Sequence, residues 1–328
     1  MTELLRIQNL TVDLPAGADR RHAIHDLSLS VNAGEIVCVV GESGSGKSLT
    51  AGAILGLLPQ GVRASGGQVL WEGEDLLRLS PAAMRRLRGQ RIGMIFQEPM
   101  TALNPLRTIG DQIGEVFRTH TRLPGGEIRR RTLGLLDSVR LPDPAHAFSA
   151  YPHELSGGQR QRAMIAMALA LEPALLIADE PTTALDVTVQ AQILALLDEM
   201  RAATGTAVLL VTHDLGVVAD HADEVVVMYA GRIAEQGPAA KVLGTPQHPY
   251  TVGLLGAAPR LDGLRGGRLA TVEGTVPDLM VPPPGCRFAP RCPFRIAACD
   301  VTPPLLDLGG GHRAACHRTP LDQFLDAA

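Results

Sequence analysis

Apolar side chains recur along the chain with two different periods. Residues 4–14 and 27–31 alternate apolar and polar positions, the pattern of a strand with one buried face. Residues 36–40 are apolar throughout and lead into a glycine-rich loop, after which residues 48–58 have the pattern of a helix that ends before Pro59. This part of the chain therefore predicts a strand, a loop and a helix in direct succession.

Helices and buried strands alternate in the middle of the chain. Residues 100–150 are rich in Arg and punctuated by Pro, and we expect a helical subdomain of about residues 100–172. Helical periodicity covers residues 109–118, 127–139 and 157–171. Residues 174–178 and 207–211 are short apolar runs typical of buried strands. The alternation predicts an α/β fold with a largely parallel sheet.

Composition narrows the classes of function. The 328 residues carry a net charge of −4 and only ten aromatic side chains, which disfavours a nucleic-acid partner. One local basic run fits a solvated helix face rather than a polyanion site: Arg85, Arg86, Arg88 and Arg91. Glu172 and Pro173 break the longest apolar stretch, and Met1–Leu4 has no signal-peptide features. We expect a cytoplasmic protein, in which any membrane role comes through partners.

A glycine-rich segment after residues 36–40 has the pattern of a phosphate-binding loop. It comprises Gly41, Glu42, Ser43, Gly44, Ser45, Gly46, Lys47 and Ser48. In such a loop the backbone amides wrap nucleotide phosphates, the lysine supplies positive charge and the last hydroxyl reaches Mg²⁺. The helix that follows adds the dipole of its N-terminus. We therefore predict phosphate binding here, with Ser48 as a Mg²⁺ ligand.

Two adjacent acids follow the apolar run 175–178. A carboxylate at the C-terminal end of a strand can hold Mg²⁺ directly or through water, which predicts this role for Asp179. Glu180 is placed to accept a proton from an attacking water or to orient that water. The alternative is a pair of solvated acids at a strand end.

The segment Leu155-Ser156-Gly157-Gly158-Gln159 predicts a second anion site. It precedes a helix, so the Ser156 hydroxyl and the glycine amides, including that of Gly158, lie at a helix N-terminus. Because the chain already has one phosphate site, two such helix ends favour two protomers arranged head to tail, with each ATP between them. The alternative is a plain serine-capped helix with a Gly-Gly turn.

Five motifs in this order resemble the ATPase subunit of an ABC transporter, over roughly the first 250 residues: 41–48, Gln97, 155–159, 179–180 and His213. The resemblance implies that Gln97 contacts Mg²⁺ and the hydrolytic water. His213 follows a buried strand, from which an imidazole can reach the γ-phosphate, and it matches the switch histidine of the family. The segment 181–186 also follows Glu180 as it does there, which favours a catalytic Glu180 over a solvated acid.

The resemblance implies partners as well. Ser156 and Gly158 would serve the ATP of a second, homologous ATPase subunit in a head-to-tail heterodimer. Two membrane permeases would hold this dimer at the cytoplasmic face of the membrane. The chain departs from the family at the expected adenine contact. Members of the family usually have an aromatic side chain near residues 15–24 that stacks on adenine, whereas this chain offers only His22 there.

Four of the five cysteines lie in the C-terminal segment, which becomes rich in Pro and Gly after about Gly237. We expect an ATPase domain of residues 1–250 and a small cysteine-rich extension of residues 251–328. The four are Cys286, Cys292, Cys299 and Cys316, with five, six and sixteen residues between them. In a reducing cytosol such a group favours metal binding over disulfides, although the spacing is not that of common zinc sites. Cys38 fits a small apolar filler of the core.

Two C-terminal segments, 246–251 and 285–293, resemble the extension of oligopeptide and dipeptide importer ATPases. That resemblance implies a [4Fe–4S] cluster on the four cysteines, with zinc second and free buried thiols as the remaining alternative. We therefore predict an ATP-hydrolysing subunit of a peptide importer, served indirectly by an external solute-binding protein. Nickel chelates or glutathione are alternative cargoes. A soluble ABC ATPase acting on ribosomes or DNA is disfavoured, because there is one set of motifs and only 132 positions separate Lys47 from Asp179.

Overall fold

The computed structural model describes residues 2–18, 20–183, 185–257, 275 and 282–321, and the chain divides into two compact units. The first unit comprises Met1–Leu4, Val31–Glu35 and Arg78–Val211, and the second comprises Leu5–Ser30, Ile36–Leu77 and Thr212–Ala328. Each unit thus joins stretches that are far apart in sequence. The division at residue 250 remains a prediction, and residues 258–274, 276–281 and 322–328 of the expected extension lie outside the described residues.

Buried parallel strands run through the first unit. β7 (Leu175–Asp179) pairs with β6 (Ile92–Ile95) on one side and with β8 (Ala207–Thr212) on the other, so that Ile177 lies opposite both Met94 and Leu209. All residues of β7 and β8 are buried, as expected for parallel strands that are covered on both faces. The predicted strands at 174–178 and 207–211 are confirmed.

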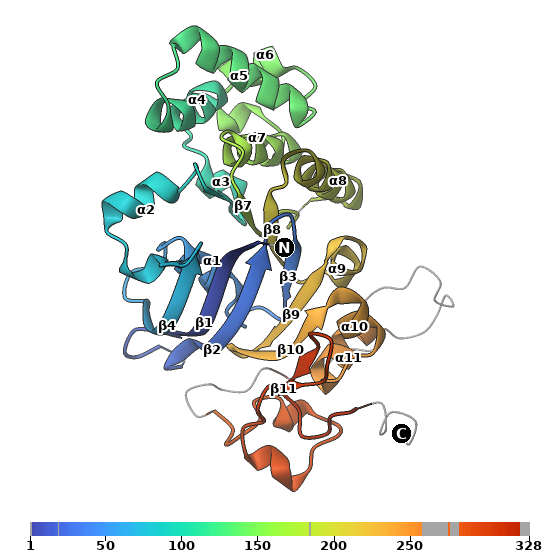
Figure 1. The fold of residues 1–328 in the computed structure, drawn as a ribbon. Coiled ribbons are helices and arrows are strands. Elements are labelled where there is room, and N and C mark those ends of the chain that lie inside the picture. Colours follow the sequence, from blue (N-terminus) through green and yellow to red (C-terminus); the bar gives the residue numbers. More distant parts are fainter. Residues whose placement is uncertain (1, 19, 184, 258–274, 276–281, 322–328) are drawn as a thin grey trace. The chain divides into compact units, whose positions relative to one another are not determined.

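Helices make up most of the remainder of the first unit. They are α2 (Pro81–Leu87), α3 (Pro99–Ala102), α4 (Ile109–His120), α5 (Gly125–Ser138), α6 (Pro144–Ser149), α7 (Gly157–Leu169) and α8 (Val187–Thr204). The helices α4, α5 and α6 pack on one another, and α4 and α5 also contact α7 (Figure 1). Ile109, Ile113 and Phe117 form the buried stripe of α4, which explains this packing.

An antiparallel sheet in the order β2-β1-β4-β5 belongs mainly to the second unit. Its strands are β1 (Glu3–Asp13), β2 (His22–Asn32), β4 (Arg63–Trp71) and β5 (Glu74–Asp75). In β1 the exposed Arg6 lies between the buried Leu5 and Ile7, and Asn9, which has φ of 49°, sits at a shift in the pairing with β4. β2 is longer than the predicted strand at 27–31.

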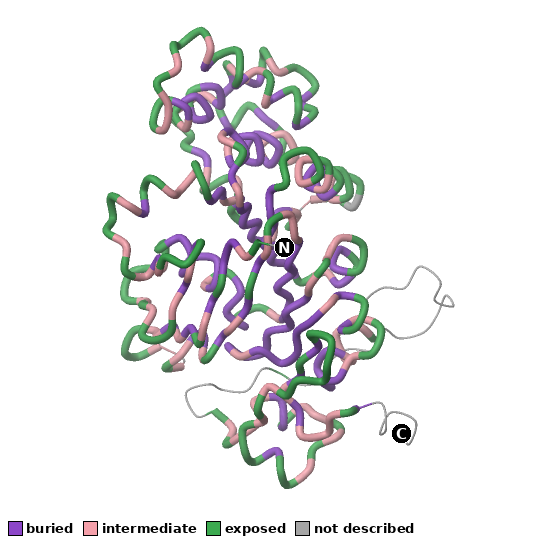
Figure 2. The backbone as a smooth tube through the Cα atoms, in the orientation of Figure 1, coloured by how far each residue is buried: buried purple, intermediate pink, exposed green. Residues whose placement is uncertain are grey.

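A second group of strands in this unit leads from the core to the C-terminal region. β3 (Ile36–Val40) runs parallel to β9 (Glu224–Tyr229), which pairs antiparallel with β10 (Arg232–Pro238). β3 is buried along its whole length (Figure 2). β10 then pairs with β12 (Arg313–Ala314), and β12 with β11 (Leu306–Asp307). The C-terminal region therefore adds strands to the edge of β10.

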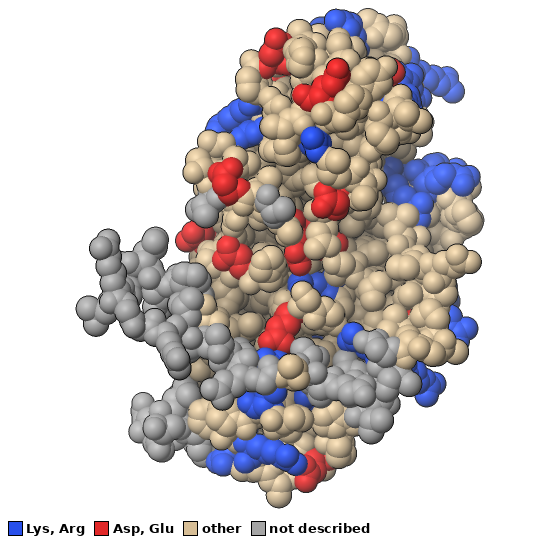
Figure 3. All heavy atoms as spheres, turned by 180° about the vertical axis from the view of Figure 1, so that it is seen from behind, with Lys and Arg blue, Asp and Glu red and all other residues tan. Residues whose placement is uncertain are grey.

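The helices of the second unit are α1 (Lys47–Ile54), α9 (Leu215–His221), α10 (Ala239–Gly244) and α11 (Pro249–Ala257). The prediction of a helix over 48–58 was too long, because α1 ends at Ile54 and Gly56 adopts φ of 61°. No helix of the described ranges combines the length and apolarity that crossing a bilayer requires. On the face shown in Figure 3, acidic and basic side chains are interspersed.

Candidate nucleotide-binding and hydrolysis site

The phosphate-binding loop connects β3 to α1, as the sequence predicts. Gly41 has φ of +154° and Gly46, the residue before α1, has φ of +105°, conformations that side chains rarely allow. A Cβ atom on Gly41 would lie 2.1 Å from the carbonyl oxygen of Met228 in β9. The glycines are therefore required both by backbone conformation and by close approach to β9.

Lys47 is folded back onto the loop. It is 5% exposed, and its Nζ donates to the carbonyl oxygens of Gly41 at 2.7 Å and Glu42 at 3.2 Å. Ser45 is 3% exposed, and its Oγ has no hydrogen-bond partner among the described residues. A buried ammonium and a buried hydroxyl in one loop are groups that phosphate oxygens can satisfy.

Glu180 lies directly after β7, in the first unit. Its carboxylate accepts hydrogen bonds from the Gln97 side chain at 3.2 Å and from the Thr183 hydroxyl at 2.8 Å. Its backbone has φ of 45°, a left-handed conformation that is strained for a glutamate, and its N–H donates to Val211 at 2.9 Å. The Gln97 and Thr183 side chains thus fix the orientation of this carboxylate.

Asp179 and Ser156 take different positions within the same unit. Asp179, the last residue of β7, is 6% exposed, whereas Ser156 is exposed at the start of α7. The Ser156 Oγ accepts the N–H of Gln159 at 3.3 Å, and the Gln159 side chain accepts the N–H of Ser156 at 2.9 Å. This capping box matches the alternative of a serine-capped helix start, and it leaves Ser156 and Gly158 at an accessible helix end.

His213 is exposed just after β8 and belongs to the second unit, as the phosphate-binding loop does. The next residue, Asp214, caps α9 by accepting the N–H of Gly216 at 2.8 Å. Gln97, Ser156, Asp179 and Glu180 all lie in the first unit. The structure brings Gln97 and Glu180 together, while a Mg²⁺ set of Ser48, Gln97 and Asp179 remains a prediction. Their hydroxyl, amide and carboxylate oxygens are donors that Mg²⁺ accepts.

The expected adenine contact would come from His22. His22 does not present a free ring, because its Nδ1 lies 2.6 Å from the Asp13 carboxylate. A cavity of about 460 Å³ is lined by Leu14, Arg20, His22 and Arg287 among others. Arg20 also donates to the carbonyl oxygen of Gly44 in the phosphate-binding loop at 2.9 Å. Among the residues that line this cavity, Arg20 and Arg287 therefore offer guanidinium groups close to the phosphate-binding loop.

The four C-terminal cysteines line one small cavity, with His248 and His317 beside them. Burial raises the pKa of Cys286, of Cys316 and of Cys292, the last to about 11. No set of three or more His, Cys, Asp or Glu side chains within the described ranges is arranged to hold a metal ion. The structure thus brings the four thiols to one cavity, while the iron–sulfur cluster and the zinc alternative remain predictions.

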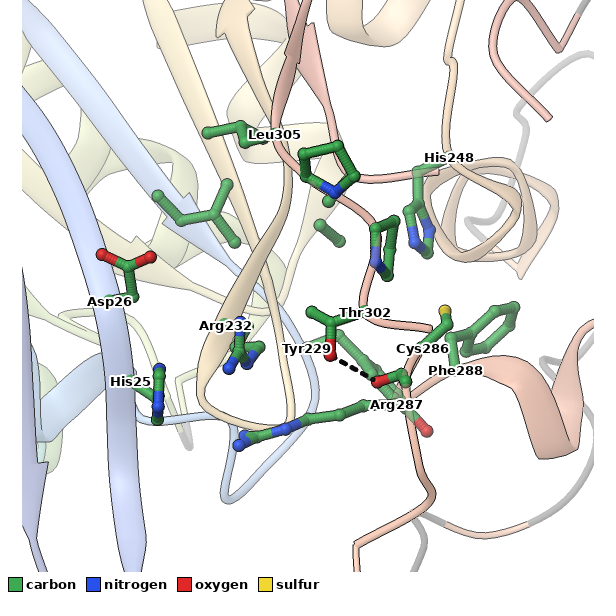
Figure 4. A pocket seen from close by; sticks show the side chains of 16 residues that line it. His25, Asp26, Tyr229, Arg232, His248, Cys286, Arg287, Phe288, Thr302 and Leu305 are labelled. Atoms are coloured by element: carbon green, nitrogen blue, oxygen red, sulfur yellow. Dashed lines mark hydrogen bonds between the residues drawn. The ribbon is translucent and has the colours of Figure 1, made fainter. Parts of the chain in front are cut away.

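A larger cavity of about 280 Å³ adjoins this group (Figure 4). Arg232 and Arg287 both line it, and burial lowers the pKa of each, that of Arg287 to about 10. Figure 4 shows Tyr229, Cys286 and Phe288 in its wall, together with the hydrogen bond of 3.4 Å from Thr302 to Gly285. The C-terminal segment therefore packs closely against β9 and β10.

Comparison with known proteins agrees with this architecture. Residues 24–183 match the family model of the ABC transporter, and residues 234–299 match the oligopeptide/dipeptide transporter C-terminal region. The dimeric structure of MJ0796, a bacterial ABC transporter cassette, has a TM-score of 0.65 and 29% identity over 72% of this chain and 99% of that one. Fold and motifs thus define an ATP-binding cassette of the ABC transporter class.

Curated relatives with higher sequence identity indicate the kind of ABC transporter. The dipeptide transport ATP-binding protein DppD of Bacillus subtilis is 51% identical over 92% of this chain and 90% of its own length. The oligopeptide transport ATP-binding protein OppD of Mycobacterium tuberculosis is 50% identical over 98% of this chain, which spans only 53% of OppD. The chain belongs to the family of ATP-binding subunits of oligopeptide and dipeptide ABC transporters.

Proposed function

We propose that this chain hydrolyses ATP to energise the import of dipeptides or oligopeptides through an ABC transporter. The main support is that one chain joins an ABC transporter cassette to the oligopeptide/dipeptide transporter C-terminal region. The relatives DppD and OppD are named for dipeptide and oligopeptide transport. Cargo specificity would lie in the permeases and in an external solute-binding protein.

ATP binding is assigned to the phosphate-binding loop. The buried Lys47 ammonium would exchange its carbonyl partners for phosphate oxygens, and the Ser45 hydroxyl would gain the partner that it lacks within the described residues. Gly41, Ser43, Gly44 and Gly46 supply the loop backbone. Ser48 and Asp179 would hold Mg²⁺, which neutralises phosphate charge when bound.

Hydrolysis is assigned to Glu180, with Gln97 and His213 as helpers. The Glu180 carboxylate would accept a proton from the attacking water as the water oxygen bonds to the γ-phosphorus and ADP leaves. Its contact with Gln97 supports this role, because an amide that holds the carboxylate also fixes the orientation of the base. His213 would stabilise the charge that develops on the γ-phosphate.

We also propose a head-to-tail pair of ATPase subunits. The exposed N-terminus of α7 would present Ser156 and Gly158 to the ATP held by a homologous partner. The cassette MJ0796, similar to this chain, has been solved as a dimer. Two permeases would bind the pair at the cytoplasmic face of the membrane, so that closure around ATP moves the permeases and hydrolysis reopens the pair.

The cysteine cavity is proposed as a metal site, with a [4Fe–4S] cluster as first choice and zinc as second. Support comes from four thiols on one cavity, where burial opposes the thiolate forms unless a cation compensates their charge. Anaerobic purification followed by iron, sulfide and zinc analysis tests this. About four irons and four sulfides per chain are expected for the cluster, and a metal-free chain would contradict both choices.

Uptake by cells tests the transport function. Cells without this chain should lose uptake of a labelled dipeptide or oligopeptide, and the wild-type chain should restore it. Glu180→Gln should not restore uptake, because the carboxylate that accepts the proton is missing. Normal peptide uptake in cells without the chain, or full restoration by Glu180→Gln, would contradict the proposal.

A further inference from the structure

Glu42, the second residue of the phosphate-binding loop, is held by two side chains from the C-terminal part of the chain. Its carboxylate forms a bidentate ion pair with Arg291, with Nη1 to Oε2 at 2.8 Å and Nη2 to Oε1 at 2.9 Å. Its backbone N–H donates to the Tyr250 hydroxyl at 2.8 Å. The Arg291 side chain is 4% exposed and that of Glu42 is 28% exposed, so solvent and salt screen this pair little.

Aromatic packing fixes both of these partners. The rings of Tyr229, Tyr250 and Phe288 contact one another, with centroids 4.7 to 5.5 Å apart. The Arg291 guanidinium lies 5.7 Å from the Tyr229 ring and 5.8 Å from the Phe288 ring, and it also donates to the Tyr229 hydroxyl at 3.3 Å. Figure 4 shows Tyr229 and Phe288 beside Cys286. Arg291 is therefore preorganised before it contacts the loop.

Glu42 in turn contacts the groups that would bind phosphate. Its carbonyl oxygen accepts the Lys47 ammonium at 3.2 Å and the backbone N–H of Ser45 at 3.2 Å. A shift of Glu42 would therefore move a phosphate-binding cation and a loop amide together. Since a phosphate cradle depends on converging N–H groups and a fixed lysine, the position of Glu42 bears directly on nucleotide affinity.

We propose that Arg291 is a positioning residue for ATP binding, acting through Glu42 on Lys47 and Ser45. The geometry of the phosphate-binding loop is then set partly by the C-terminal region. This proposal rests on ATP binding at the loop, and it is independent of which peptide the transporter carries. Arg291 itself contacts no phosphate in this scheme, so its loss weakens binding without removing a ligand.

The test is calorimetric titration of the full chain with MgATP. Arg291→Ala should raise the Kd about tenfold while the number of sites per chain stays unchanged. A purely structural role would instead lower the number of competent sites at constant Kd. Glu42→Gln should raise the Kd for MgATP by a similar factor. The double variant Glu42→Gln/Arg291→Ala should have a Kd no higher than that of the weaker-binding single variant, because both substitutions remove the same ion pair.

Two further variants keep the test decisive. Arg295→Ala is the matched control, because Arg295 lies in the same segment but pairs with Asp300 in an exposed ion pair, and its Kd should equal that of the wild type. Arg291→Lys keeps the charge but loses the bidentate fork, so its Kd should be intermediate even if Arg291→Ala does not fold. Wild-type Kd values in Arg291→Ala and Arg291→Lys would overturn the proposal. Failure of the wild-type chain to bind MgATP would instead overturn the proposed ATPase function.

Discussion

Replacement of Glu235 by alanine should destabilise the attachment of the C-terminal region by about 3–5 kcal/mol. The carboxylate is 0% exposed and accepts the backbone N–H groups of Gln247 at 2.7 Å and His248 at 2.9 Å. It also lies 2.7 Å from Nε2 of His312, the residue before β12. Each buried donor left without an acceptor costs roughly 1–3 kcal/mol. The net loss is smaller than the sum of these costs, because the substitution also removes the free-energy cost of burying the Glu235 carboxylate. That cost is the reason why burial raises the pKa of Glu235.

Thermal unfolding followed by circular dichroism, with limited proteolysis of the C-terminal region, measures this effect. The expected loss corresponds to a midpoint lower by about 10 °C. Glu199→Ala is the matched control, because Glu199 also pairs with a basic side chain, Arg140, at 2.6 Å, but both partners are 55% exposed. That control should lose less than about 1 kcal/mol. Equal midpoints for the two variants would refute the assignment of this stability to the buried carboxylate.

Three further substitutions probe the nucleotide site. Glu180→Gln should retain MgATP binding and accumulate an ATP-bound dimer in gel filtration, and normal turnover by this variant would remove Glu180 from catalysis. Ser156→Arg should lower nucleotide occupancy at the partner's loop in a heterodimer, and a loss confined to this chain's own loop would contradict the head-to-tail arrangement. Gly41→Ala should abolish MgATP binding measured by calorimetry, because the added Cβ would lie 2.1 Å from the Met228 carbonyl oxygen. A wild-type Kd in that variant would show that the loop can move away.

The local elements around the site could be predicted because each follows from a short-range pattern. The apolar run of β3, the glycines of the loop and the helical start at Lys47 are contiguous, and the structure has them in that order. The buried runs of β7 and β8 were equally clear, since continuous apolar stretches mark parallel strands. The end of α1 at Ile54 was missed, because helix-favouring residues continue beyond it until the positive φ of Gly56 turns the chain.

Contacts between distant parts of the chain could not be predicted. Arg291 lies 249 positions from Glu42, and Tyr250 lies 208 positions from it, so no periodicity connects them. The same holds for Glu235, whose burial beside His312 depends on the pairing of β10 with β12. The sequence held one clue, since a nearby cation favours the ionised form of a glutamate that lies beside phosphate charges. For the four C-terminal cysteines, the sequence predicts that the thiols lie together. Their proximity does not by itself establish a bound metal.

Peptide-dependent ATP hydrolysis in proteoliposomes measures whether this chain powers peptide import. The full chain would be reconstituted with its partner ATPase and permeases, and phosphate release measured with and without a peptide-loaded external binding protein. We expect the loaded binding protein to raise turnover and to drive peptide into the vesicles, and Lys47→Ala in this chain to abolish both. Peptide uptake that persists in the Lys47→Ala complex, or hydrolysis that ignores the peptide, would contradict this expectation.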